Sequence, residues 1–167
     1  MAEVTGPGPL VTVRLVQFPV DLWARADSET RDLLREFVLI SIDQEHDVPR
    51  QLLALVNELQ QGYGSMSAAQ TARLEAARAA GEDVIAELTY EVPAEIGAGV
   101  LRLGQLLDEA DEYCRRGEHL LSLASSQSAK AFREWFLEEF SRQLAGEEPI
   151  PWPASDHALA LQGASGE

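Results

Sequence analysis

The segment Val84–Leu123 constrains the fold more than any other part of the chain. Its first nine residues alternate, which is the period of a strand with one buried face. We expect Val84, Ala86, Leu88, Tyr90 and Val92 on the buried face and Ile85, Glu87, Thr89 and Glu91 on the other. Pro93 then cannot donate to a sheet ladder and suits the first turn of a helix. Apolar residues recur behind it at helical spacing, namely Ile96, Val100, Leu103, Leu106, Leu107 and Ala110. A strand, a proline corner and a long helix are therefore predicted.

The same order of elements occurs once before. Residues 11–18 have apolar side chains on both faces, which favours a more central strand, and Pro19 ends it. A helix with one apolar and one charged side then extends over residues 21–40. The two units share their order of elements, but their sequence identity is too low to establish a duplication.

Three further helices complete the predicted secondary structure. One spans residues 49–61, after a cap at Asp47, and ends at Gly62. The second is the alanine-rich segment 67–81. The third begins at residues 125–127 and carries an aromatic stripe consisting of Phe132, Trp135, Phe136 and Phe140, with Glu134, Glu138 and Glu139 facing outward. Glycines 97, 99 and 104 lie inside the helix after Pro93, where we expect close packing on a strand and no phosphate-binding loop.

These elements predict a mostly helical α+β fold with two short strands. We expect a flexible arm over residues 1–10, a single domain over 11–146, and a proline-rich strap followed by a disordered tail over 147–167. Two strands alone are marginally stable, so a four-stranded sheet shared by a homodimer is an attractive arrangement.

Composition narrows the classes of function. Twenty-eight acidic against thirteen basic residues give a net charge of −15, which disfavours binding to nucleic acid and to anionic membranes. The N-terminus lacks the pattern of a signal peptide, and no apolar run is long enough to span a membrane. Cys114 is the single cysteine, so we expect a soluble cytoplasmic protein with an unreactive thiol on a helix.

No motif of a catalytic or metal site is present. The acidic segment 42–49 holds His46 among carboxylates, but adjacent residues rarely converge on one ion and no HExxH or EF-hand pattern occurs. We interpret this segment as a turn and His157 as part of the tail. An enzyme using His46 or His119 with neighbouring carboxylates is the least favoured function, and we predict no cofactor.

Two segments carry a resemblance to a known group of proteins. Residues 12–37, TVRLVQFPVDLWARADSETRDLLREF, and residues 111–146, beginning DEYCRRGEHLLSL, look like small regulatory proteins of high-GC bacteria that accompany partner-switching modules. The resemblance implies a non-enzymatic protein that binds another signalling protein, such as an anti-sigma kinase or a phosphatase. Residues 56–64, VNELQQGYG, resemble the asparagine-bearing helix of anti-sigma kinases, but the chain lacks the accompanying DxGxG box and we expect no ATP binding.

Two hypotheses about the site follow. A protein-binding domain would use exposed carboxylates and the aromatic helix, and its candidate contacts are Asp108, Glu109, Asp111, Glu112, Trp135, Phe136 and Trp152. The spacing of the aromatic residues also suits a role in the core. A small-molecule sensor would instead have a pocket between the alanine-rich helix and the sheet, lined by Trp23, Tyr63 and Tyr90.

Overall fold

The computed structural model describes residues 8–43, 47–116 and 125–153. Over these residues the chain forms strands β1 (Leu10–Pro19) and β2 (Val84–Pro93) and five α-helices. The helices are α1 (Val20–Asp43), α2 (Asp47–Tyr63), α3 (Ala68–Ala79), α4 (Ile96–Arg115) and α5 (Gln127–Leu144), with the 3-10 helix η1 (Gly64–Ser67) between α2 and α3. The predicted α+β class and both strand, proline and helix units are confirmed, although α2 continues through Gly62 to Tyr63.

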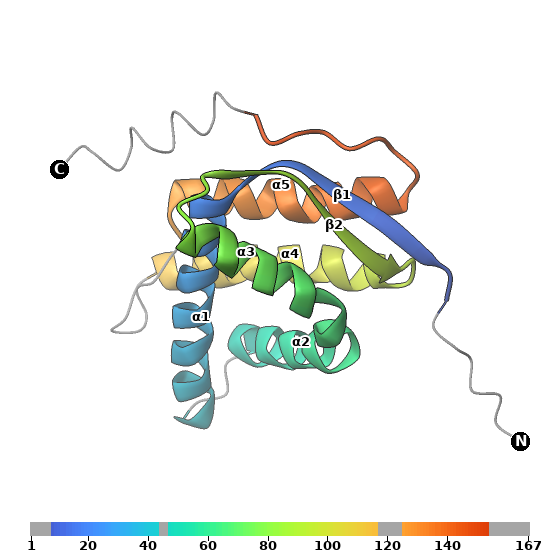
Figure 1. Ribbon diagram of the computed structural model, residues 1–167. Coiled ribbons are helices and arrows are strands. Elements are labelled where there is room, and N and C mark those ends of the chain that lie inside the picture. The colour runs from blue at the N-terminus through green and yellow to red at the C-terminus, as the bar shows by residue number, and fades with distance from the viewer. Residues whose placement is uncertain (1–7, 44–46, 117–124, 154–167) are drawn as a thin grey trace, which may run out of the picture.

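β1 and β2 form an antiparallel pair that crosses one side of the molecule (Figure 1). The register joins Leu10 to Pro93 at one end and Pro19 to Val84 at the other. The side chains on the inner face are buried, and they are Val13, Leu15, Leu88, Tyr90 and Val92. The alternation read from the sequence is therefore correct for this half of the sheet.

The alternation changes at Gln17. Its φ of 56° lies in the left-handed region, which is unusual for a residue with a side chain. At the end of the sheet where Pro19 pairs with Val84, Phe18 and Ile85 are buried, whereas Val84 and Ala86 are exposed. The expectation that Val84 and Ala86 face the core was wrong because the backbone turns at Gln17 and shifts both strands to the other parity. The same turn buries Phe18, and this change of face produces the mixed pattern of β1.

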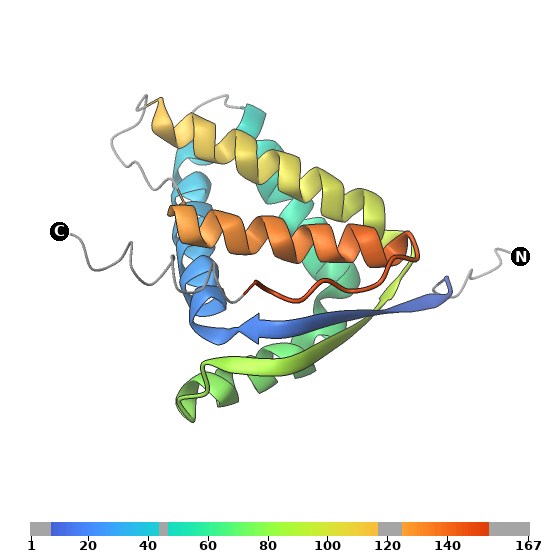
Figure 2. The same cartoon turned by 90° about the horizontal axis from the view of Figure 1, so that it is seen from above.

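The outer edge of β1 is closed by other parts of the chain. The Arg14 N–H donates to Gln143 Oε1 at 2.8 Å, and Gln143 Nε2 donates to the Arg14 carbonyl at 2.8 Å. The Trp152 N–H donates to the Val16 carbonyl at 3.0 Å. Figure 2 shows the segment that carries Trp152 between β1 and α5. The predicted strap therefore occupies the position of a third strand.

A buried carboxylate fixes this strap. Glu139 is 2% exposed and accepts hydrogen bonds from Gln143 Nε2 at 2.9 Å and from the Ile150 N–H at 3.0 Å. Arg142 pairs with the second Glu139 oxygen at 2.9 Å. Glu139 thus faces inward, in contrast to the outward position expected from its helical spacing, because its partners are backbone and side-chain donors.

The apolar side chains form two clusters. The first joins the sheet with α3, α5 and Trp152, and the second joins α1, α2 and α4 around Phe37 and Leu106. Two glycines let α4 approach its neighbours, since a Cβ at Gly99 would lie 3.1 Å from Leu59 of α2 and one at Gly104 would lie 3.4 Å from Leu137 of α5. Close packing was expected there, but its partners are helices and not a strand.

The predicted dimer remains a prediction. The described residues hold one sheet of two strands, β1 and β2. Because Gln143 and Trp152 occupy the outer edge of β1, a second copy could extend the sheet only along β2. The tail that was expected to be disordered lies outside the described residues.

Replacing Gln143 by alanine removes both amide contacts to Arg14 and one to Glu139. We expect the free energy of unfolding to fall by about 2 to 4 kcal/mol, because buried backbone groups and a carboxylate lose their partners. Urea unfolding measures this change. Gln127→Ala on the exposed start of the same helix is the control and should alter stability by less than about 0.5 kcal/mol. Equal effects of the two substitutions would contradict the assignment.

Candidate functional site

The aromatic stripe of α5 lies mostly in the interior. Phe132 and Phe136 pack around Phe18, with ring centroids 5.5 and 6.4 Å from it. Trp152 is 6% exposed and its ring lies 5.4 Å from Trp135, whose indole N–H donates to the Ile150 carbonyl. The core role expected from the spacing accounts for Trp135 and Phe136 better than a contact surface does, and Trp152 of the strap is buried against the same rings.

The predicted acidic surface is divided by the structure. Asp108, Glu109 and Glu112 are exposed on α4, as expected. Asp111 is 1% exposed and lies 2.8 Å from Arg133 Nη2, and it accepts the Ser125 N–H at 3.0 Å. The expectation of an outward Asp111 was wrong because this carboxylate connects α4 to the start of α5.

The histidines of the enzyme hypothesis, His46 and His119, lie outside the described residues, and so does His157 of the predicted tail. Cys114 lies on α4, as expected, and is 7% exposed within the second apolar cluster. Within the described segments no three His, Cys, Asp or Glu side chains are grouped to hold a metal ion. No helix of these segments is both long and apolar enough to cross a membrane.

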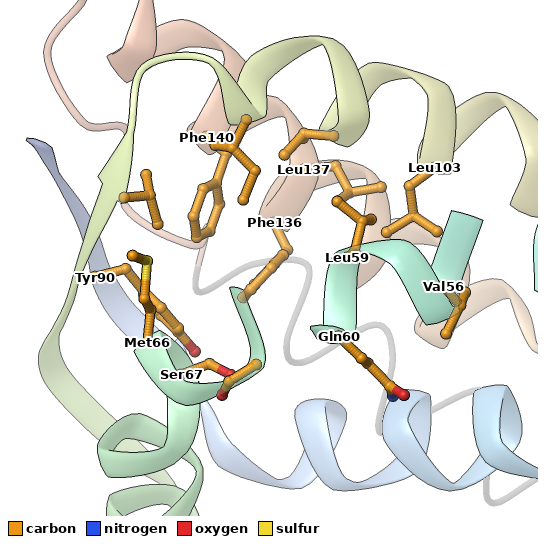
Figure 3. Close-up of a pocket in the computed structure, with 14 residues that line it drawn as sticks. Val56, Leu59, Gln60, Met66, Ser67, Tyr90, Leu103, Phe136, Leu137 and Phe140 are labelled. Carbon is orange, nitrogen blue, oxygen red and sulfur yellow. The ribbon is translucent and has the colours of Figure 1, made fainter. Parts of the chain in front are cut away.

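A cavity of about 290 Å³ lies between β2 and the helices (Figure 3). Its walls come from α2, η1, β2, α4 and α5. Most of the lining side chains are apolar, and they are Val56, Leu59, Met66, Val92, Ile96, Val100, Leu103, Phe136, Leu137 and Phe140. Gln60 and Gly64 are exposed members of the lining, so the cavity reaches the surface along α2 and η1.

Tyr90 supplies the phenol of this cavity. Its ring packs on Phe140 and Phe136 with centroid distances of 5.3 and 6.1 Å. Burial raises the pKa of the Tyr90 hydroxyl, so it stays protonated at physiological pH. Figure 3 shows this hydroxyl directed toward Ser67, whose own hydroxyl donates to the Gly64 carbonyl. A neutral hydrogen-bonding group therefore stands at the η1 side of an otherwise apolar wall.

The structure brings only part of the predicted pocket together. Tyr90 lines the cavity, whereas Trp23 lies in a polar depression between α1 and α3 beside Asp27 and Arg31. The side chain of Tyr63 is not among those described. No residue of α3 lines the cavity, so the alanine-rich helix is not its wall.

The main wall residues were not recognised as a site from the sequence. Leu59, Val100 and Leu137 belong to the apolar stripes of three helices, and a stripe that faces a cavity has the same period as one that faces a packed core. Only the three-dimensional packing separates the two cases.

Acid should weaken the contact between α4 and α5. Burial raises the pKa of Asp111, but hydrogen bonds from Arg133 and Ser125 and the charge of Arg133 outweigh it, and the net pKa lies below 3.8. The stabilisation is therefore complete above this ordinary value and is lost as pH falls through the lower folded value.

We expect Asp111→Asn to reduce the free energy of unfolding by about 2 to 4 kcal/mol at neutral pH, with the difference from the native chain shrinking in strong acid. Asp108→Asn removes the exposed partner of the same Arg133 and should cost less than about 1 kcal/mol. Urea unfolding as a function of pH measures both. A pH-independent effect of Asp111→Asn would show that the charge is not responsible.

Comparison with protein-family models finds no matching family, and searches of curated proteins and of solved structures find no match to the chain.

Proposed function

We propose that this chain is a non-enzymatic sensor domain that binds a small, neutral and largely apolar molecule. The observation that carries the proposal is the cavity beside Tyr90. Its described lining contains no carboxylate, imidazole, thiol, ammonium or guanidinium group, so it supplies no base that would activate the hydroxyls of Ser67 and Tyr90. Such a lining favours binding over catalysis.

The cavity limits the size and polarity of the ligand. Its volume of about 290 Å³ is close to the lower end of the range for ligand pockets, about 300 Å³, and about twice that of an engineered cavity of about 150 Å³ that holds benzene. A charged ligand would lose its hydration without gaining an opposite charge. A two-ring aromatic molecule with one hydrogen-bond acceptor for Tyr90 fits both limits.

A second candidate function is binding of another signalling protein, as the resemblance to proteins of partner-switching modules implies. The observation that favours it is the outer edge of β2, along which Glu87 and Glu91 are exposed residues. The two functions are compatible, since a sensor domain transmits ligand binding through a contact with another protein.

Filling the cavity should abolish binding. With acetylnaphthalene as probe, at about 100 times its dissociation constant, the native chain should melt about 5 to 10 °C higher. Val56→Trp, on the α2 wall, should remove this shift because the indole occupies the space of the ligand. Val38→Trp places the same side chain at a 47% exposed position of α1 and should keep the shift. An undiminished shift in the Val56 variant would place the ligand elsewhere.

Removing the phenol hydroxyl should affect only ligands with an acceptor. We expect Tyr90→Phe to weaken binding of acetylnaphthalene about 3- to 10-fold, the value of one hydrogen bond. Binding of ethylnaphthalene, which has nearly the same shape and no acceptor, should change less than about twofold. Isothermal titration calorimetry compares the four affinities. Equal losses for both probes would mean that Tyr90 acts only through packing.

A further inference from the structure

The register identifies which backbone groups of β2 point away from β1. Arg14 and Val16 direct backbone groups to the outer edge of β1, where Gln143 and Trp152 bind them. In an antiparallel ladder, residues opposite such outward positions also direct their N–H and C=O groups outward. The register places Thr89 opposite Arg14 and Glu87 opposite Val16. The outer edge of β2 is therefore formed by the backbone N–H and C=O groups of Glu87, Thr89 and Glu91.

The outer edges of β1 and β2 differ in the hydrogen bonds that side chains make to their backbone groups. Gln143 closes β1 at Arg14 with both its carbonyl and its amide group. Gln70 of α3 contacts β2 with its amide group alone, which donates to the Thr89 carbonyl at 2.8 Å. The Gln70 Oε1 atom is buried and has no hydrogen-bond partner in the part of the chain that the structure describes. Among the described residues, no other hydrogen bond is made to the outward backbone groups of β2.

Surroundings of this edge suit an added strand. Figure 2 shows β2 at the outside of the sheet, with β1 between it and α5. A depression of about 410 Å³ lies beside the edge, lined by Leu10, Thr12, Met66, Gln70, Thr89 and Glu91. Exposed sheet edges bind extended peptides through backbone hydrogen bonds, and adjacent depressions receive alternate side chains.

Charge distinguishes between the possible occupants. Glu87 and Glu91 are exposed on the outer face of the sheet, and only Glu87 has an ion-pair partner among the described residues, Arg14 at 2.7 Å. A second copy would bring its own Glu87 and Glu91 to the same face, and like charges on neighbouring strands are destabilising. The net charge of −15 adds to this repulsion. A strand with basic side chains is instead attracted.

We propose that the outer edge of β2 binds an extended basic segment of a partner protein as a third strand. This inference rests on the protein-binding candidate function and not on the cavity. The incoming strand displaces the Gln70 amide from the Thr89 carbonyl and replaces its hydrogen bond with one from a peptide N–H. Lysine or arginine side chains at alternate positions pair with Glu87 and Glu91.

The direct test uses a fluorescent octapeptide in which lysine and valine alternate, with a glutamate-valine peptide as its acidic counterpart. We expect fluorescence anisotropy to show binding of the basic peptide at least about tenfold tighter than the acidic one. Amide NMR signals of Glu87, Thr89 and Glu91 should shift on binding. Equal affinity for the two peptides, or no shift along β2, would overturn the proposal.

Two variants locate the contact. Thr89→Pro deletes an outward N–H for which the described residues supply no partner, so we expect the fold to persist and peptide binding to fall about tenfold. Glu91→Lys reverses one charge and should also weaken binding of the basic peptide about tenfold, whereas Glu58→Lys, at an exposed position of α2, should change it less than about twofold. Comparable losses in both lysine variants would reveal a non-specific charge effect and refute the edge contact.

Light scattering separates this inference from the predicted homodimer. A dimer of the native chain that dissociates on Thr89→Pro would assign the edge to a second copy and overturn the basic partner. If the basic peptide bound with NMR shifts confined to another element, the edge would be refuted and the protein-binding function would stand. Failure of acetylnaphthalene binding would leave the proposal for β2 unaffected.

Discussion

The side-chain amide of Gln143 is the contact on which the arrangement of this fold depends. It accepts a hydrogen bond from the Arg14 N–H, donates one to the Arg14 carbonyl and donates another to the Glu139 carboxylate. A two-stranded sheet is marginal by itself in water and exposes two edges. By completing the edge of β1 from α5, Gln143 makes the sheet part of the helical body, and Glu139 extends the same network to the strap at Ile150.

The apolar cavity and the depression beside the outer edge of β2 share a wall. Met66 of η1 lines both the apolar cavity and the depression beside β2. Gln70, which contacts the β2 edge, lies four residues further along the chain at the start of α3. A ligand that displaces Met66 therefore changes the boundary of the edge as well. This shared boundary gives the proposed sensor and the proposed docking edge a physical route of coupling.

Local patterns in the sequence were sufficient to predict the elements, because strand and helix periods and proline corners depend on neighbouring residues. The same patterns failed where a side chain meets a distant partner. Asp111 and Glu139 looked like surface acids, yet each is buried by donors that include backbone amides of separate segments, Ser125 and Ile150. The change of buried face at Gln17 comes from a left-handed backbone conformation, and no glycine in the sequence indicates it. The cavity could not be predicted from the sequence because its walls come from five elements.

Burial of these two carboxylates explains how an apolar cavity persists in so small a domain. A buried ion pair adds little net stability over well-packed apolar residues, but any arrangement that breaks it is costly. Arg133 of α5 pairs with Asp111 of α4, and Glu139 of α5 accepts the Ile150 N–H, so the two carboxylates hold α5 on either side of Phe136. Sliding or rotating α5 to fill the cavity would break the pair of Arg133 with Asp111, the hydrogen bond from the Ile150 N–H to Glu139 and the contact of Gln143 with β1. The helix is therefore held where Phe136, Leu137 and Phe140 form a wall, and the space before them stays open.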